Sequence, residues 1–211
     1  MKNYGITCIL FLITFLSYSQ TFDQKIEDLI NENLDETIEL RHWFHQNAEL
    51  SNREFKTAAR IAEELKKIGY EPMTGIAKTG VVAILNPGKP GPVVGLRADI
   101  DALPVKERAD IPWASKMKGV YNGEEVPVMH ACGHDMHTAI LLAAAKILYE
   151  IKDEIPGQVK FIFQPAEEGA PPGEEGGAEL MVKEGVLKNP DVDAIFGLHV
   201  WSGLYAGQVY L

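Results

Sequence analysis

The sequence predicts an α/β protein in which a mixed, largely parallel sheet is flanked by helices. Between residues 22 and 68, apolar residues recur every three or four positions, which is typical of helices that bury one face. Beyond Tyr70 the pattern changes to short apolar runs bounded by glycine and proline, which indicates strands. Helical patterns separate several of these runs, so we expect parallel strand pairs in the sheet.

The N-terminus has the pattern of a secretory signal peptide over residues 1–20. Lys2 precedes an apolar run, Ile6–Leu16, and small residues follow with a cleavage site expected near Ser19. An uncleaved membrane anchor is the alternative, but this run is shorter than the roughly 20 residues that a bilayer span needs. We therefore expect export to the periplasm or the medium, and no membrane attachment after cleavage. Residues 21–211 would form part of a catalytic domain.

Composition points to an ordinary globular protein and argues against two classes of partner. The chain is 46% hydrophobic and 24% charged, and about 190 residues remain after cleavage. Its formal net charge of −10 argues against nucleic acid or an anionic membrane as a partner. The cleaved chain keeps a single cysteine, Cys132, which has no partner for an intramolecular disulfide. That leaves ligation, burial or intermolecular pairing for this thiol.

Two helices are expected before the first strand. Residues 22–44 form a long amphipathic pattern, and Ser51-Asn-Arg-Glu54 has the spacing of a capping box that opens a second helix. Gly69 ends that helix. His42 and His45 fall at the end of the first helix, where surface or core roles are favoured over catalytic ones.

Four strands are expected after Tyr70, at residues 80–85, 93–97, 158–163 and 193–198. The proline-rich and glycine-rich turn at residues 86–92 favours antiparallel pairing of the first two strands. A helical pattern at residues 178–187 separates the last two.

The segment Val128–His137 concentrates metal-binding side chains at the entrance to a helix. It holds three of the six histidines together with Cys132, and the helix-forming run Ala139–Leu148 follows. A helix start offers unpaired N–H groups and the positive end of the dipole, so we expect a lowered pKa for the Cys132 thiol. Cys132 and His134 are one residue apart and can face one ion, because thiolate and imidazole are zinc-type ligands.

The remaining polar residues of this segment are expected to support the ligands or to face the substrate: His130, Asp135 and His137. The alternative is a helix cap, by Asp135 or Thr138, next to an incidental cysteine.

Three predicted strands end in side chains that suit a metal site. Ligands in α/β sheets bind beyond the carboxyl ends of the strands. The residues in question are Asp99 and Asp101 after the second strand, Glu167 and Glu168 after the third, and His199 after the fourth. All of these ends can share one edge of the sheet with the helix that carries Cys132 and His134.

Glu167 and Glu168 are adjacent, so in extended chain their side chains point in opposite directions. One glutamate can bind a metal ion while the other removes a proton from water. A solvated acidic loop is the alternative, and we adopt that interpretation for Glu174 and Glu175, which lie between glycines and prolines. Asp99 and Asp101 can orient a histidine ligand or bridge two ions, with helix capping as the alternative.

Four strings of residues closely resemble the N-acyl-amino-acid amidohydrolases. This family includes hippurate hydrolases, aminoacylase-like enzymes and plant auxin-conjugate hydrolases, within the dinuclear-metal aminoacylase and carboxypeptidase clan. The resemblance extends over essentially the whole chain after the signal peptide and implies the N-terminal half of a zinc-exopeptidase-like catalytic domain. The strings are Gly95–Pro104, His130–His137, Phe163–Gly169 and Gly197–His199.

The resemblance implies a role for each matching residue. It implies Glu167 as general base and acid, and Asp101, in the string Asp-Ala-Leu-Pro, as the orienting carboxylate, with Asp99 the less certain neighbour. The cofactors would be two divalent ions, zinc or manganese, and the substrate a small N-acyl or N-aroyl amino acid. The implied metal ligands are Cys132, His134, Glu168 and His199.

The chain also departs from the family pattern. Ala48 stands where relatives usually have a proline before the glutamate, and relatives continue past Leu211 into a lid or dimerisation domain. That second part normally brings a fifth ligand, a histidine, and implies a homodimer. We therefore expect the front half of an exported amidohydrolase that is active when complete. The alternatives are a non-catalytic metal-binding remnant, or a carboxypeptidase or dipeptidase of the same clan.

Overall fold

The computed structural model describes the backbone of residues 4–210 and the side chains of residues 22–210. By its contacts the chain divides into two units, residues 1–36 and 37–211. Helix α1 (Tyr4–Gln46) contains the whole described part of the first unit, where Gln24 bonds Asp28 one turn later. The side chains of the predicted signal peptide lie outside the described residues. In the part of the chain that the structure describes, no helix combines the length and apolarity needed to cross a bilayer.

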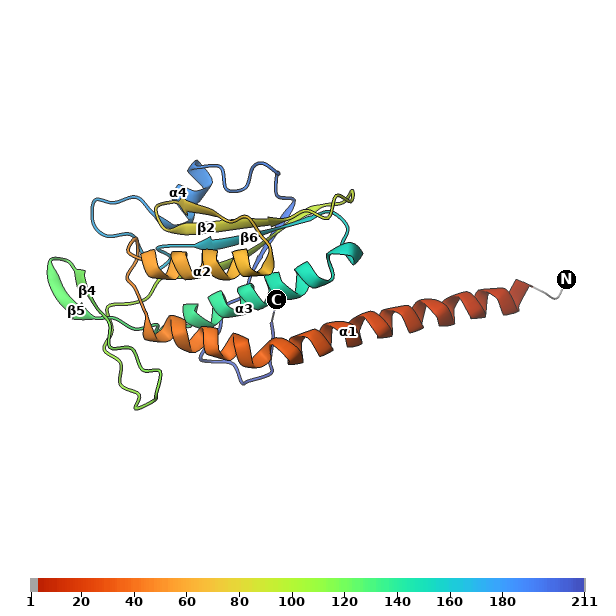
Figure 1. The fold of residues 1–211 in the computed structure, drawn as a ribbon, viewed down its shortest axis with the longest axis horizontal. Coiled ribbons are helices and arrows are strands. Elements are labelled where there is room, and N and C mark those ends of the chain that lie inside the picture. The colour runs from red at the N-terminus through yellow and green to blue at the C-terminus, as the bar shows by residue number, and fades with distance from the viewer. Residues whose placement is uncertain (1–3, 211) are drawn as a thin grey trace. The chain divides into compact units, whose positions relative to one another are not determined.

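The second unit is built on a five-stranded mixed sheet (Figure 1). The central strands are parallel to each other and the strands at one side are antiparallel, which confirms the predicted mixed α/β class. A separate two-stranded sheet pairs β4 (Lys118–Tyr121) with β5 (Glu124–Pro127). In spatial order the five strands are β1 (Met73–Ile76), β2 (Gly80–Leu85), β6 (Gln158–Gln164), β3 (Val93–Asp99) and β7 (Ala194–Gly197).

The predicted pairing of β2 with β3 is wrong, because β6 lies between them. Val82 pairs with Ile162 in antiparallel register, and Leu96 pairs with Phe161 in parallel register. The turn at residues 86–92 reverses the chain direction, but a turn alone does not determine which strand becomes the neighbour. Strand β6 is buried on both faces over residues 159–164, which suits a central position.

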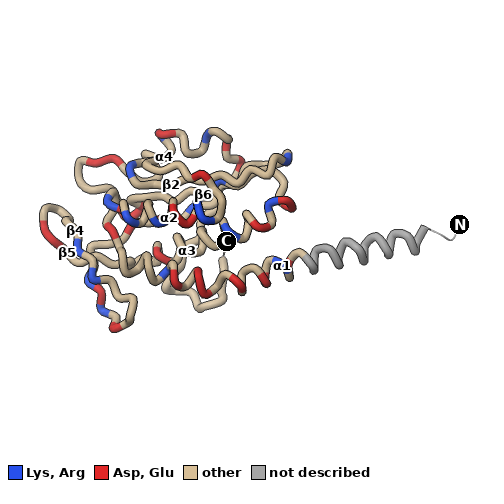
Figure 2. The backbone as a smooth tube through the Cα atoms, in the orientation of Figure 1, with Lys and Arg blue, Asp and Glu red and all other residues tan. Residues whose placement is uncertain are grey.

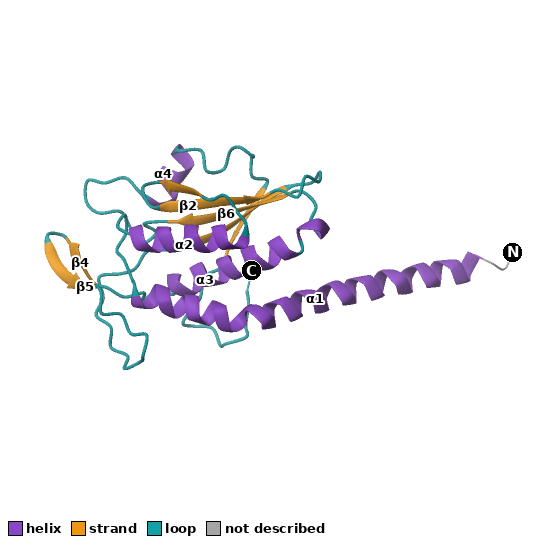
Figure 3. Cartoon of the chain, viewed as in Figure 1, coloured by secondary structure: helices purple, strands orange, loops and turns teal. Residues whose placement is uncertain are grey.

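Helices cover both faces of the sheet (Figures 1 and 3). Helices α2 (Phe55–Ile68) and α3 (His134–Glu150) pack on one face, where Phe161 and Phe163 join the main core. On the other face Ile162 packs with Met181 of α4 (Gly177–Lys183). Helix α4 is shorter than the predicted helix at 178–187, because Gly185 adopts a positive φ of +83° just beyond its end. A 3-10 turn follows α3 at Lys152–Glu154.

Strands β2 and β6 are tan, and so uncharged, along most of their length in Figure 2. Lys160 is the one charged residue in these two strands. Its side chain is fully buried, and its ammonium group donates to the backbone carbonyls of Val186, Lys188 and Pro190 at 2.8–3.0 Å. These three acceptors compensate for the buried charge and hold the loop between α4 and β7 against the sheet.

The predicted capping box at residues 51–54 does not form. Helix α2 begins at Phe55, and its N-cap residue Glu54 makes no side-chain cap hydrogen bond. Instead, Glu49 caps the helix from outside, since its carboxylate accepts from the backbone N–H of Thr57 at 2.9 Å. The predicted helix end at Gly69 is confirmed, with φ +117°.

Candidate metal centre

The predicted strand ends do meet at one edge of the sheet. Asp99 pairs with Gln164 across β3 and β6, and Arg97 pairs with Gly197 across β3 and β7. The chain segments that leave these three parallel strands therefore start side by side. They bring together with the start of α3 all of the predicted site residues: Asp99, Asp101, Cys132, His134, Glu167, Glu168 and His199.

His134, the first residue of α3, lies at the centre of this group with only 1% of its side chain exposed. Its Nε2 atom is buried without a hydrogen-bond partner, and three carboxylate oxygens surround it. Asp99 Oδ2 and Glu167 Oε2 each lie 3.6 Å away, and Glu168 Oε1 lies 3.8 Å away. An unpaired ring nitrogen facing several carboxylates fits a bound cation.

Two groups of side chains in the described residues could each hold a metal ion. Within each group the ligand atoms lie within 4.8 Å of one another, and His134 belongs to both. The combination of thiolate, imidazole and carboxylate donors fits zinc and other first-row divalent ions. One group is Asp99, His134, His137 and His199, and the other is Cys132, His134 and Glu168.

His137 has both ring nitrogens engaged by the protein. Its Nδ1 lies 2.6 Å from Asp99 Oδ1, and its Nε2 accepts the backbone N–H of Val200 at 3.0 Å. Since no lone pair is left for a metal ion, we assign His137 to holding Asp99 and the loop after β7. His199 differs, because its Nδ1 donates to the Val200 carbonyl at 2.6 Å and its Nε2 lies 3.5 Å from Cys132 Sγ.

Asp101 connects two of the predicted ligands. Its Oδ2 accepts the Ser51 hydroxyl at 2.7 Å and the Glu168 backbone N–H at 3.0 Å. Its Oδ1 lies 3.3 Å from His134 Nδ1. Burial alone would raise the pKa of Asp101, but the hydrogen bonds from His134, Ser51 and Glu168 outweigh it and hold that pKa below its usual range. Asp101 is thus an ionised carboxylate that orients a histidine and a glutamate.

Asp99 is fully buried and also ionised. Arg97 Nη1 lies 2.7 Å from its Oδ2. Burial opposes ionisation, yet the hydrogen bond from His137 and the charges of His134 and Arg97 keep the pKa of Asp99 low.

The prediction of a low pKa for the Cys132 thiol is wrong when only protein groups surround the thiol. Burial, the hydrogen bond to Glu168, and the charges of Glu168, Glu167 and Asp99 raise the pKa of Cys132 to about 11. The helix dipole effect is small beside three nearby carboxylates. Ionisation of this thiol therefore requires a cation as compensating charge.

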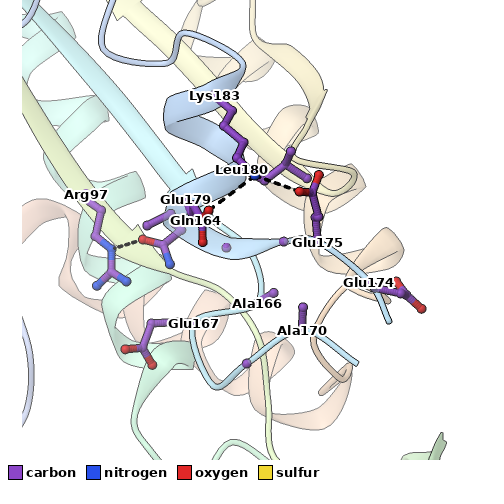
Figure 4. A pocket seen from close by; sticks show the side chains of 14 residues that line it. Arg97, Gln164, Ala166, Glu167, Ala170, Glu174, Glu175, Glu179, Leu180 and Lys183 are labelled. Atoms are coloured by element: carbon purple, nitrogen blue, oxygen red, sulfur yellow. Dashed lines mark hydrogen bonds and ion pairs between the residues drawn. The ribbon is translucent and has the colours of Figure 1, made fainter. Parts of the chain in front are cut away.

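Glu167 stands between His134 and open pocket space. Its side chain is 38% exposed and lines a polar pocket of about 530 Å³ next to Arg97 and Gln164 (Figure 4). Glu174 and Glu175 of the following loop and Glu179 of α4 line the same pocket. Glu175 and Glu179 pair with Lys183, and Glu174 pairs with Lys78 and Arg53. A second pocket, of about 480 Å³, opens beside Cys132 and His199. Glu167 can therefore contact both the ligand cluster and an entering molecule.

The network around His45 could not be found from the sequence. His45 is buried, with Nδ1 2.9 Å from Asp135 Oδ2 and Nε2 2.7 Å from Glu107 Oε2. It joins the end of α1 to the first turn of α3, beside His134. His42 instead stacks on Trp113 with ring centroids 3.7 Å apart. Both positions agree with the predicted core or surface roles, but their partners are distant in sequence.

The part of the chain that holds the candidate site matches a known protein family. The model of peptidase family M20/M25/M40 matches residues 95–210, which contain every predicted site residue. The chain belongs to this peptidase family.

Curated members of the family share more than 40% identity with the chain. It is 43% identical over 185 residues to "Thermostable carboxypeptidase 2" of Saccharolobus solfataricus. It is 42% identical over 186 residues to "N-acyl-L-amino acid amidohydrolase" of Geobacillus stearothermophilus. It is 43% identical over 175 residues to "Hippurate hydrolase" of Campylobacter jejuni. These matches cover 87%, 88% and 82% of this chain but 44%, 46% and 42% of the relatives. The chain thus spans less than half the length of these M20 relatives.

Solved M20 structures share the fold. A protein of methicillin-resistant Staphylococcus aureus superposes with a TM-score of 0.76 at 41% identity, covering 85% of this chain and 43% of that one. The YXEP protein of Bacillus subtilis, described as a dinuclear metal binding peptidase from the M20 family, superposes with a TM-score of 0.68 at 40% identity. That match covers 78% of this chain and 42% of the other.

Proposed function

We propose that the complete protein hydrolyses the amide bond of N-acyl or N-aroyl amino acids and releases a carboxylic acid and an amino acid. The observation that carries this proposal is the unpaired, buried His134 Nε2 among the carboxylates of Asp99, Glu167 and Glu168. The relatives named N-acyl-L-amino acid amidohydrolase and hippurate hydrolase support this substrate class.

Two divalent ions, zinc or manganese, are the proposed cofactors, with Cys132, His134, Glu168 and His199 as the residues that would hold them. When bound, such ions polarise the scissile carbonyl and lower the pKa of a coordinated water toward about 7. A thiolate favours the softer ion, zinc.

Glu167 is the proposed general base and acid. Its carboxylate accepts the proton of the attacking water as the water oxygen bonds to the carbonyl carbon. Glu167 then returns this proton to the amine nitrogen as the carbon–nitrogen bond breaks. Asp101 contributes by fixing His134 and the Glu168 backbone in place.

The second candidate is a carboxypeptidase, because the chain is equally similar to a protein of that name. The two reactions use the same chemistry and differ in what lies on the acyl side of the amide bond: a simple acyl or aroyl group in one, a peptide in the other.

The test uses the full-length protein loaded with zinc or manganese. We expect two metal equivalents by elemental analysis and release of amino acids from N-acetyl and N-benzoyl substrates. Glu167→Gln should keep the metal but lose at least about 100-fold in kcat. Glu179→Gln, an exposed change in the same pocket, is the control. Cleavage of peptides alone would favour the carboxypeptidase, and metal binding without any amide hydrolysis would favour a non-catalytic remnant.

We also propose that residues 1–20 are removed on export, that residues 21–211 form part of the catalytic domain, and that the complete protein is a homodimer. The signal-peptide pattern and the family resemblance support these points. N-terminal sequencing of the protein from cell fractions tests the first, and light scattering after gel filtration tests the last. An intact N-terminus or a monomer would contradict them.

A further inference from the structure

Every residue of the segment Ser51–Glu54 bonds a distant part of the active-site surroundings. Ser51 donates to Asp101, as described above. Asn52 donates to the Glu175 backbone carbonyl at 3.0 Å, and Arg53 pairs with Glu174 at 2.5 Å. This segment therefore attaches to the chain on both sides of the site rather than capping α2.

Of the four residues in this segment, Glu54 makes the contact closest to the proposed general base, Glu167. Its Oε1 accepts the backbone N–H of Ala166 at 2.9 Å, and its Oε2 accepts the Thr79 hydroxyl at 2.6 Å. On the other side of Glu167, Asp101 accepts the backbone N–H of Glu168 at 3.0 Å. Two buried carboxylates thus hold the backbone N–H groups of the residues on either side of Glu167, which are Ala166 and Glu168.

The backbone at this turn needs such support. Ala166 has a φ of +49°, in the left-handed region that residues with a Cβ atom rarely adopt because of steric crowding. Pro165 precedes it and Gly169 follows Glu168, so no regular structure stabilises the turn. The hydrogen bond from Ala166 to Glu54 ties the strained residue to α2.

The burial of the Glu54 side chain is a second feature that needs an explanation. Its side chain is completely buried, and burying a carboxyl group is unfavourable unless its hydrogen bonds are satisfied. Among the described residues these bonds go to Thr79 and Ala166, and none goes to the helix that Glu54 precedes. Its geometry is therefore explained by the turn that it holds.

We propose that Glu54 is a positioning residue for the general base: by binding the Ala166 N–H, it fixes the turn that presents Glu167 to the substrate amide. The inference rests on the proposed function of Glu167. Loss of this contact should affect kcat more than KM, because the substrate-binding surface is unchanged while the base is displaced from the reacting water.

The experiment compares four variants of the metal-loaded, full-length protein. Glu54→Ala removes the acceptor, and Glu54→Gln keeps an oxygen for Ala166 and offers an N–H to Thr79. Thr79→Val removes only the hydrogen bond that the Thr79 hydroxyl donates to Glu54 Oε2. Glu49→Ala is the matched control, since it removes a carboxylate that caps the same helix without touching the turn.

We expect Glu54→Ala to lower kcat by about 100-fold, with KM within about threefold of wild type. Hydrogen exchange of the peptide 164–169, followed by mass spectrometry, should accelerate in the same variant. Glu54→Gln should restore most of kcat and the slow exchange. Thr79→Val should give a smaller loss of kcat, and it replaces Glu54→Ala as the deciding variant if that protein does not fold. Glu49→Ala should lower the melting temperature and leave kcat and the exchange of this peptide unchanged.

The inference is overturned if Glu54→Ala keeps kcat and slow exchange, if Glu54→Gln is as slow as Glu54→Ala, or if Glu49→Ala loses as much kcat. With Thr79→Val as the deciding variant, wild-type kcat and exchange would overturn it. If the wild-type protein hydrolyses no amide, the proposed function fails, and the exchange measurement alone decides whether Glu54 holds the turn.

Discussion

The Nδ1 atom of His134 lies 2.9 Å from the backbone carbonyl oxygen of Asp101. A carbonyl oxygen can only accept, so Nδ1 carries a proton, and in the neutral form of the ring the lone pair lies on Nε2. Strand β3 ends two residues before Asp101, and α3 begins at His134, so the tautomer is set by where two secondary-structure elements meet. Both the backbone carbonyl and, at 3.3 Å, the carboxylate of Asp101 therefore hold His134 with Nε2 facing the candidate metal site.

Because His134 belongs to both groups of candidate ligands, His134→Ala should abolish binding of both ions. Cys132→Ala removes a ligand from one group only and should retain one metal equivalent. Elemental analysis of the purified, dialysed proteins measures the stoichiometry. His42→Ala, which removes a ring stacked on Trp113, should keep two equivalents. Two equivalents in His134→Ala would refute the shared-ligand assignment.

Glu54→Gln should change how stability depends on pH. Burial raises the pKa of Glu54 from 4.5 to about 7. A raised folded-state pKa contributes stability that is present below the unfolded value and lost as pH rises through about 7. Glutamine does not ionise, so the variant should gain about 3 kcal/mol in free energy of unfolding relative to wild type between pH 4.5 and 8.

Urea denaturation at several pH values measures this difference. Glu63→Gln is the control, because Glu63 is exposed and the hydrogen bond from Lys67 lowers its pKa. If the free energies of unfolding of wild type and Glu54→Gln change in parallel with pH, folding does not raise the pKa of Glu54.

His45→Gln should destabilise the protein more at low pH than at high pH. The hydrogen bond to Asp135 raises the pKa of His45, against the opposing effect of burial, and Glu107 adds to the increase. The stabilisation is therefore full below pH 6.5 and lost as pH rises through the folded-state value. Loss of charged hydrogen bonds should cost about 2 kcal/mol at pH 6.

Denaturation curves at pH 6 and pH 9 test this difference. Glu107→Gln, which leaves the bond to Asp135, should keep part of the pH dependence. An equal effect of His45→Gln at both pH values would show that His45 is uncharged in the folded protein.

Gly133→Ala should weaken metal binding. Gly133 has a φ of +91°, and an added Cβ would overlap Val200 Cγ2. Displacing Val200 would break its bond to His137 and move the adjacent His199. We expect an affinity loss of about 10-fold or more, measured by competition with a chelating dye.

Gly173→Ala is the matched control. It has a φ of +80° and open space around the added Cβ, so it introduces similar backbone strain without a clash. If both substitutions lower the metal affinity equally, the loss results from general destabilisation and not from the clash with Val200.

Much of the candidate site follows from the sequence because it depends on short spacings. One residue separates Cys132 from His134 at a helix start, and Glu167 and Glu168 lie three and four residues beyond the end of a buried strand. Parallel strands place their carboxyl ends at one edge, so the grouping of these residues with Asp99 and His199 could be inferred without coordinates.

Other features depended on partners that local patterns do not reveal. The segment Ser51–Glu54 has the spacing of a capping box, yet its side chains find better partners elsewhere. The turn at residues 86–92 reverses the chain, but β6 separates the two strands that it joins. The low pKa predicted for Cys132 neglected the burial of the thiol and the carboxylates that the fold places around it.

By itself, the sequence determined the α/β class and the identity and spacing of the metal-binding side chains, because periodicity and strand-end chemistry are local properties. Only the tertiary structure decided the tautomer of His134, the high pKa of the Cys132 thiol and the support of the Glu167 turn by Glu54. Glu54 and Ala166 lie 112 positions apart in the chain, and Asp101 and His134 lie 33 apart. Hydrogen bonds and electrostatic fields act over a few ångströms in space, so residues this distant in sequence influence one another only once the chain has folded.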